Sequence, residues 1–204
     1  MVTPSSWIVA EAEKMGFDAC GISCATLLEE ESAHVEQWLE GEREGEMGYL
    51  TRNKEKRYDP RLLVEGTKSI VTVLYNYYPQ QTLSDSDKFK IAKYAYGVDY
   101  HEVLKNKMRL LLERIESQTG KLEGTRVFVD SAPVLDRAWA VRCGLGFIGK
   151  NTTLIHPKKG SFFFIGHLFL PIVLTETGQP MTNRCGRCTK CLDACPTGAL
   201  EAPP

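Results

Sequence analysis

Cys185-Gly-Arg-Cys188-Thr-Lys-Cys191-Leu-Asp-Ala-Cys195-Pro196 is the most informative segment of this 204-residue chain. Its four cysteines are separated by two, two and three residues and followed by proline, which is the bacterial spacing for ligands of a [4Fe–4S] cluster. A zinc knuckle or a disulfide pair is the alternative, but zinc sites usually combine two Cys-x-x-Cys pairs with a longer insert. We therefore predict that Cys185, Cys188, Cys191 and Cys195 are iron–sulfur ligands.

The fourth cysteine of this spacing has two interpretations. In two-cluster proteins it binds the other cluster, whose remaining ligands come from a later cysteine motif. Here only nine residues follow Cys195. Either Cys195 completes a single cluster or the chain is a fragment of a longer protein, and we expect the fragment.

Composition describes an ordinary globular protein, with 43% hydrophobic and 25% charged residues. No stretch approaches the ~20 apolar residues of a membrane span. Residues 1–7 lack the basic and apolar regions of a secretory signal. Seven cysteines, four of them in one thiolate motif, indicate a reducing compartment. We expect a cytoplasmic protein without membrane contact.

Charge is unevenly distributed along the chain. Residues 1–50 carry two basic and eleven acidic side chains, whereas the remaining residues carry 23 basic and 15 acidic ones. A basic remainder suits a phosphate-bearing cofactor or a nucleic acid. Solvated charge spread evenly over helices is the alternative.

Helical periodicity and apolar β-branched runs alternate along residues 1–175, without detectable repeats. Helices are expected at 5–15, 29–41, 100–119 and 134–143. Strands are expected at 18–23, 69–75, 126–130 and 161–170, with the last beside 127–129. Residues 53–63 are expected to form a polar, basic loop. This alternation favours a layered α/β or α+β domain, followed by a cluster-binding appendage from about residue 180.

Asp130 is the first candidate for catalysis, because it ends a predicted strand at the edge of the sheet. A carboxyl group in a partly apolar setting would keep its proton more readily, as a general acid requires. The alternative is an N-cap for the helix that follows, a role that Ser131 could equally fill.

Two further segments could form a site. Gly144-Leu-Gly146-Phe-Ile-Gly149-Lys150-Asn151 resembles a loop that cradles an anion, although it follows a helix and so lacks the dinucleotide-binding context. Tyr96-Gly-Val-Asp99-Tyr-His101 places an acid, an imidazole and two phenols together, and Asp99 could simply cap a helix. Arg57 could bind phosphate or face solvent.

These motifs together resemble the epoxyqueuosine reductase family. The resemblance rests on the 129–134 and 142–150 segments, Gly160-Ser161-Phe-Phe-Phe164, the cysteine motif, the 96–101 segment and Arg57-x-x-Pro60, which occur in the family's order over nearly the whole chain. It implies a nitroreductase-like α/β cobalamin-binding catalytic domain over residues 1–178. The first half of a ferredoxin-like [4Fe–4S] domain would follow over residues 179–204.

The resemblance also implies a function. Members are cobalamin-dependent oxidoreductases that reduce epoxyqueuosine to queuosine in the tRNA anticodon loop, the last step of queuosine biosynthesis, with electrons passed through [4Fe–4S] clusters. It implies an external electron donor, tRNA as the partner and a monomer. Asp130 is similar to the family's proton donor. Positions expected to line the cobalamin or substrate pocket are Arg57, Tyr96, Asp99, His101, Asp130, Gly144, Gly146, Phe147, Gly149, Lys150, Asn151 and Ser161.

The chain departs from the family by lacking a second cysteine motif. We therefore expect that by itself it binds cobalamin but reduces epoxyqueuosine poorly or not at all. Two other functions compete with this interpretation. One is an iron–sulfur electron-transfer module, and the other is a corrinoid reductase for a small molecule, such as a dehalogenase.

Overall fold

The computed structural model describes residues 5–81 and 91–201. Its helices are α1 (Ser5–Lys14), α2 (Glu29–Glu40), η1 (Gly48–Thr51), α3 (Lys54–Tyr58), α4 (Pro60–Leu63), η2 (Lys93–Ala95), α5 (Tyr100–Thr119), α6 (Asp136–Arg142) and α7 (Lys190–Asp193). Its strands are β1 (Ala19–Cys24), β2 (Ser69–Asn76), β3 (Arg126–Phe128), β4 (Phe147–Ile148), β5 (Leu154–Ile155) and β6 (Phe163–Leu170).

A four-stranded antiparallel sheet, in the order β1-β2-β6-β3, forms the centre of the molecule. The β2 and β6 strands are rich in β-branched and aromatic residues, which favour extended backbone, and pair over their full eight-residue lengths. The predicted pairing of the 161–170 strand with 127–129 is confirmed, because Phe128 lies opposite His167. A separate β4-β5 hairpin follows α6.

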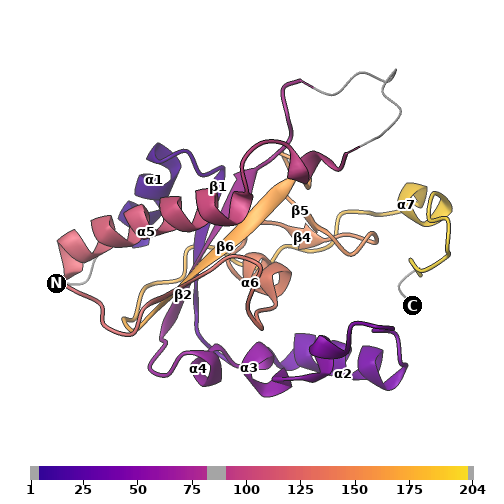
Figure 1. The fold of residues 1–204 in the computed structure, drawn as a ribbon, viewed down its shortest axis with the longest axis horizontal. Coiled ribbons are helices and arrows are strands. Elements are labelled where there is room, and N and C mark those ends of the chain that lie inside the picture. Colours follow the sequence, from indigo (N-terminus) through magenta and orange to yellow (C-terminus); the bar gives the residue numbers. More distant parts are fainter. Residues whose placement is uncertain (1–4, 82–90, 202–204) are drawn as a thin grey trace.

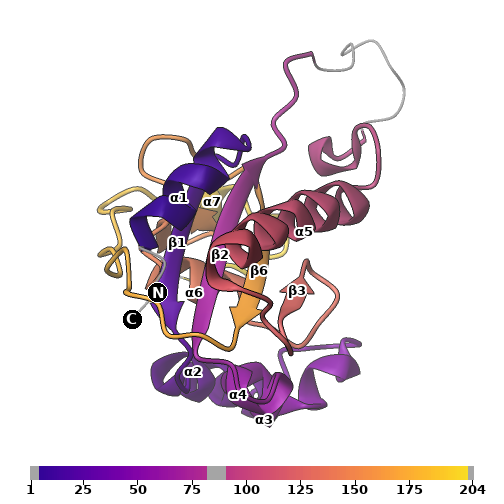
Figure 2. The same cartoon turned by 90° about the vertical axis from the view of Figure 1, so that its left-hand side faces the viewer.

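Helices cover both faces of the sheet (Figures 1 and 2). Alternate side chains of β2 point to opposite faces, so Val71 and Val73 pack under α1 and α5 while Ile70 and Leu74 pack under α6. Leu104, Met108, Leu111 and Ile115 of α5 are fully buried at helical spacing. The predicted mixed, layered architecture is confirmed.

One segment differs from its prediction. Residues 53–63, expected to be a loop, contain the short helices α3 and α4, and Asp59 caps α4 by accepting a hydrogen bond from the Arg61 N–H. Arg57 and Tyr58 are buried. With α2, these helices form the lower part of the molecule in Figure 1. The expectation of a polar, basic loop is therefore wrong, because the segment is helical.

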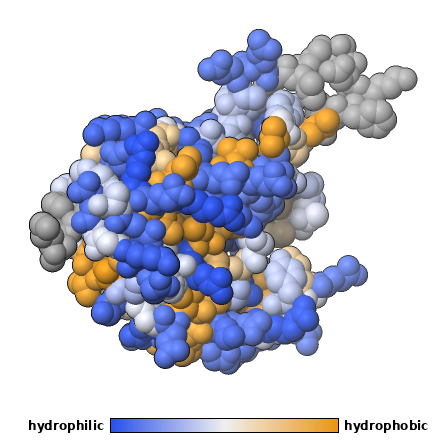
Figure 3. Space-filling view, turned by 60° about the vertical axis from the view of Figure 1, so that its left-hand side comes forward, coloured by the Kyte–Doolittle hydropathy of each residue, from blue (hydrophilic) through white to orange (hydrophobic). Residues whose placement is uncertain are grey.

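The outer surfaces are polar. In the space-filling view of Figure 3, hydrophilic side chains cover most of the face shown, and apolar side chains form separate patches between them. None of the helices in residues 5–81 and 91–201 combines the length and the apolar character that a membrane span needs.

A buried polar network holds α6 against the sheet. The His167 side chain is fully buried, with Nδ1 3.0 Å from Thr72 Oγ1 and Nε2 3.1 Å from Asp136 Oδ1. Cys143 Sγ lies 3.3 Å from the same Thr72 hydroxyl. Each polar side chain of this network therefore has a partner, which offsets the cost of its desolvation.

We expect His167→Leu to lower the free energy of unfolding by about 2–4 kcal/mol, because it removes the imidazole partner of Asp136 and one of the two partners of Thr72. Urea denaturation followed by circular dichroism measures the change. His34→Leu, on the exposed side of α2, is the matched control and should change little. Equal midpoints for the two variants would contradict a stabilising role for the network.

Candidate active site

Asp130 lies two residues beyond the end of β3, in a tight turn. The N–H of Ser131 bonds to Val129 O at 2.7 Å and the N–H of Ala132 bonds to Asp130 O at 3.0 Å. Asp130 has a φ of 60°, in the left-handed region that few L-residues other than aspartate and asparagine adopt. Such strained residues cluster at functional sites.

The surroundings of Asp130 correct two expectations. Its side chain is 63% exposed, so the expected partly apolar setting is wrong. The N-cap of α6 is Leu135, and no side chain caps that helix. Capping therefore explains neither Asp130 nor Ser131, and the carboxylate is free to contact other groups.

The carboxylate joins a cluster that starts α5. Tyr100 donates its phenolic hydrogen bond to Asp130 Oδ2, and His101 Nε2 lies 3.6 Å from the same oxygen. The other ring nitrogen, His101 Nδ1, lies 2.7 Å from Asp99 Oδ1. Asp99 also caps α5 by accepting the His101 N–H, so the predicted capping role is confirmed.

Protonation follows from these contacts. Desolvation, and then the hydrogen bond to Asp130, raise the pKa of Tyr100 above its ordinary value, so the phenol keeps its proton at neutral pH. Hydrogen bonds from the backbone N–H and the ring of His101 lower the pKa of Asp99, which therefore stays charged. The cluster thus places a phenol donor and an imidazole beside an exposed carboxyl group, a set of groups that can move protons.

A row of aromatic rings fixes Tyr100. Its ring stacks on Phe164 of β6 at 3.9 Å and 3°, and Phe164 lies 4.6 Å from Tyr77. Phe162 continues the row to Tyr78 at 4.9 Å, where the two residues are 37% and 51% exposed. An aromatic cluster therefore extends from Asp130 to the surface, and its outer rings, Tyr77, Phe162 and Tyr78, meet edge to face.

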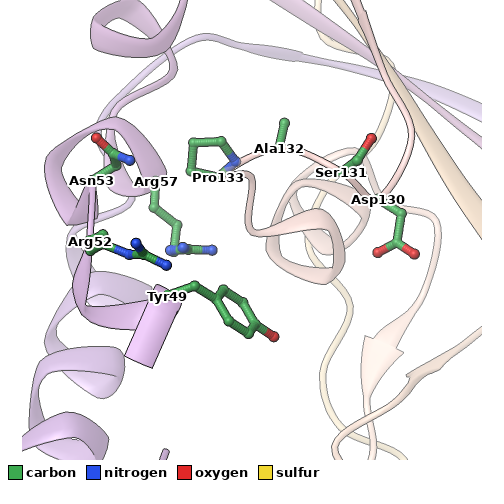
Figure 4. Close-up of a pocket in the computed structure, with 8 residues that line it drawn as sticks. All are labelled: Tyr49, Arg52, Asn53, Arg57, Asp130, Ser131, Ala132 and Pro133. Carbon is green, nitrogen blue, oxygen red and sulfur yellow. The ribbon is translucent and has the colours of Figure 1, made fainter. Parts of the chain in front are cut away.

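A pocket of about 390 Å³ opens beside the Asp130 turn. It is lined by Tyr49, Arg52, Asn53, Arg57, Asp130, Ser131, Ala132 and Pro133. Figure 4 shows the two arginine side chains on the wall that carries α3, with the Asp130 turn across from them. The pocket thus brings Arg57 and Asp130, both predicted site residues, to one site.

The glycine-rich loop is explained by close backbone packing. A Cβ at Gly144 would lie 2.9 Å from the Gly178 Cα, and one at Gly146 would lie 2.5 Å from the Ile155 carbonyl oxygen. At Gly149 it would lie 2.5 Å from the Ile155 side chain. Since the chain itself fills this space, the three glycines do not form an open cradle in this structure.

Lys150 connects the glycine-rich loop to the cysteine segment. Its Nζ donates to the carbonyl oxygens of Gly186 at 2.9 Å and Cys188 at 3.2 Å. Asn183 Nδ2 makes a second connection, to Ile148 O at 3.0 Å. The ammonium group therefore positions the cysteine loop, a role that the sequence did not indicate.

The remaining predicted positions lie in different settings. Phe147 is only 6% exposed, which argues against a direct cofactor contact for its ring. Asn151 Oδ1 accepts from the Thr153 N–H at 3.3 Å within its own turn. Tyr96 is half-buried at the end of η2, and Ser161 is half-buried just before β6. The structure does not bring the 144–151 loop into the contacts around Asp130.

The four motif cysteines lie around α7, with Cys188 exposed and the other three half-buried. Across residues 5–81 and 91–201, no three His, Cys, Asp or Glu side chains gather closely enough to hold a metal ion. Hydrogen bonds from the backbone of Leu200 and from Thr197 lower the pKa of Cys195 to about 7. The thiols therefore fit an iron–sulfur cluster in donor chemistry, and binding would draw the four sulfur atoms together.

Comparisons with known proteins agree on one family. Residues 57–131 match the family model described as Epoxyqueuosine reductase QueG, DUF1730. Over 196 residues the chain is 52% identical to an epoxyqueuosine reductase of Leadbetterella byssophila, covering 96% of this chain and 64% of that protein.

Solved structures give the same result. The epoxyqueuosine reductase of Streptococcus thermophilus superposes with a TM-score of 0.85 at 30% identity, covering 96% of this chain and 53% of that one. An epoxyqueuosine reductase solved with a tRNA-Tyr epoxyqueuosine-modified tRNA stem loop has a TM-score of 0.81 at 31% identity, covering 96% and 52%. The chain thus spans between about half and two thirds of the length of these relatives.

Fold and site together define a class of protein: a mixed α/β domain with an antiparallel sheet, an acid–base cluster at the sheet edge and an attached cysteine segment. Sequence and structure comparisons identify the family within this class. The chain belongs to the epoxyqueuosine reductase family, as its motifs predicted.

Proposed function

We propose that this chain is the catalytic part of a protein that reduces epoxyqueuosine to queuosine in the tRNA anticodon loop. The observation that carries the proposal is the exposed Asp130 carboxyl group, which contacts Tyr100 and His101 at the mouth of a pocket. Family membership and the relative solved with a modified tRNA stem loop support the same substrate.

The reaction defines what the chain's residues must do. Converting an epoxide to an alkene consumes two electrons and two protons and releases the oxygen as water. Asp130 protonates the epoxide oxygen as its carbon–oxygen bond breaks. Tyr100 donates the hydrogen bond that holds the carboxyl group in place, and His101, whose Nε2 lies 3.6 Å away, passes it the next proton. The exposed position of Asp130 leaves room for a nucleoside to reach it.

Cobalamin is the proposed cofactor, and aromatic and polar side chains near Asp130 have the chemistry to bind it. The aromatic cluster from Tyr100 to Tyr78, exposed at Phe162 and Tyr78, supplies apolar surface that suits a macrocycle. A corrinoid is larger than the 390 Å³ pocket, so it would lie on the open surface beside the pocket. Tyr96, Asp99, His101 and Ser161 remain the proposed contacts. When bound, cobalamin supplies the electron-transfer chemistry at cobalt.

The cysteine segment is the proposed route for electrons. Residues 179–201 contain no buried residue, which supports an appendage distinct from a cobalamin domain over residues 1–178. We further propose that the domain is nitroreductase-like and that 179–204 begins a ferredoxin-like domain. Cys185, Cys188, Cys191 and Cys195 would hold [4Fe–4S] iron, and Lys150 would hold their loop against the domain. An external donor would supply the electrons. The protein would act as a monomer.

The test uses the chain within a protein of the relatives' full length, purified without oxygen and reconstituted with cobalamin, iron and sulfide. We expect a retained corrinoid spectrum, and loss of one oxygen atom from an epoxyqueuosine stem-loop by mass spectrometry. Iron–sulfur absorbance without corrinoid would favour the electron-transfer module. Corrinoid binding without tRNA turnover would favour a small-molecule reductase.

A further inference from the structure

Arg57 is an unusual residue in the pocket beside Asp130. Its side chain is nine-tenths buried, and its Nε has no hydrogen-bond partner among the described residues. Figure 4 shows its guanidinium group next to that of Arg52, above the Tyr49 ring. A buried donor without a partner costs about 1–3 kcal/mol, and more when it is charged, so a ligand that accepts its hydrogen bond would remove this cost.

The two arginines also differ in their pairing from the basic residues nearby. Basic residues nearby are ion-paired, since Lys54 binds Glu36 at 2.6 Å and Arg61 binds Asp59 at 2.7 Å. Within the described residues no ion pair involves Arg52 or Arg57. Asp130 is the acidic residue of the lining, and it lies on the opposite side of the pocket. Arg52 and Arg57 therefore give this side of the pocket a positive charge that an anionic ligand could neutralise.

We propose that Arg52 and Arg57 bind a phosphodiester of the RNA backbone beside the reacting nucleotide, and so hold that nucleotide against the Asp130 turn. Guanidinium groups match phosphate because they present several N–H donors in a planar fork. This inference rests on the proposed function, because it identifies how the same site recognises its tRNA substrate.

Tyr49 favours RNA as the source of the phosphodiester. The nucleotide part of a corrinoid carries the same group, so charge alone does not separate the two. Tyr49 lines the pocket with its ring and is 55% exposed. An exposed aromatic ring beside cationic groups is how proteins bind unstacked bases of single-stranded loops. The pocket therefore offers contacts for both a base and its phosphate.

Binding of a fluorescent tRNA anticodon stem-loop to the full-length protein tests the proposal. Arg52→Gln is expected to weaken binding about tenfold, and to reduce the slope of log Kd against log salt by about 0.7. Arg57→Lys keeps the charge but loses the fork, so it should weaken binding while retaining the slope. Lys56→Gln, an exposed residue of the same helix outside the pocket lining, is the matched control and should behave as the wild type.

Two results would overturn the proposal. One is that Arg52→Gln and Lys56→Gln bind the stem-loop equally well with the same salt slope. The other is that the arginine variants lose corrinoid on gel filtration while RNA affinity is unchanged, which would assign the pocket to the cofactor's phosphodiester. The proposed function can fail separately. If the wild type binds the stem-loop through Arg52 but does not reduce epoxyqueuosine, the phosphate-binding proposal is supported and the proposed reaction is contradicted.

Discussion

Asp130→Asn is expected to slow epoxyqueuosine reduction by about 100- to 10,000-fold, the usual contribution of a positioned general acid. Asparagine suits the test because it tolerates the left-handed backbone that Asp130 adopts. It also keeps the size of the side chain and its hydrogen bond with Tyr100, while removing the acidic proton. The loss is therefore assigned to proton transfer and not to a collapsed turn.

Single-turnover conversion of an epoxyqueuosine stem-loop measures this effect in the full-length protein. Glu102→Gln, which removes an exposed carboxylate next to His101, is the control for local charge and should retain activity. Corrinoid content and RNA affinity should be similar in both variants, because each substitution keeps the size of the side chain. A rate for Asp130→Asn close to that of Glu102→Gln would remove Asp130 from the mechanism.

Gly21→Ala is expected to lower the free energy of unfolding by about 3 kcal/mol, at the upper end of the cost of overpacking. Gly21 lies in β1, where the end of α6 approaches the sheet. A Cβ there would lie 2.4 Å from the carbonyl oxygen of Cys143 and 2.9 Å from its Cβ. Because a backbone atom is in the way, relief requires α6 to move away from the sheet.

Urea denaturation of the chain measures the change, and Gly48→Ala is the matched control. A Cβ at Gly48 meets nothing within 4 Å, and the backbone there has an ordinary φ. The control should stay within about 0.5 kcal/mol of the wild type. If the two variants unfolded at the same urea concentration, the close approach of α6 to β1 would not be a tight constraint.

The sequence predicted the elements whose signals are local. Helix α5 shows apolar residues at helical spacing between an Asp99 cap and Gly120, whose φ of 85° only glycine adopts readily. The β2 and β6 strands are long enough for β-branched and aromatic residues to identify them. Their positions follow from residues that are neighbours along the chain.

The sequence did not predict the short helices at 54–63. Helices of five and four residues are too short to show a periodic pattern of apolar residues. The charged residues of α3 also give no apolar signal for a helix. The burial of Arg57 depends on contacts with residues that are remote in the chain. Two basic residues at 52 and 57 were a weak signal for the pocket, and nothing local distinguished them from solvated arginines.

The glycine-rich loop shows that one pattern can have two structural causes. Its pattern predicted a cradle for an anion, whereas the structure explains Gly144 and Gly146 by contacts with residues 178 and 155. Glycine is required both where a ligand approaches the backbone and where another segment does. Sequence spacing does not distinguish the two, since the approaching segment lies elsewhere in the chain.

The sequence by itself determined the family, the cysteine spacing, the mixed α/β class and Asp130 as a candidate, because each depends on residue identity and local order. Only the tertiary structure decided that Tyr100 and His101 contact Asp130 and that Lys150 holds the cysteine loop. It also decided that Arg57 is buried, with an Nε that has no partner among the described residues. These contacts join segments that the packing of the sheet and its helices brings together, and such packing depends on the whole core.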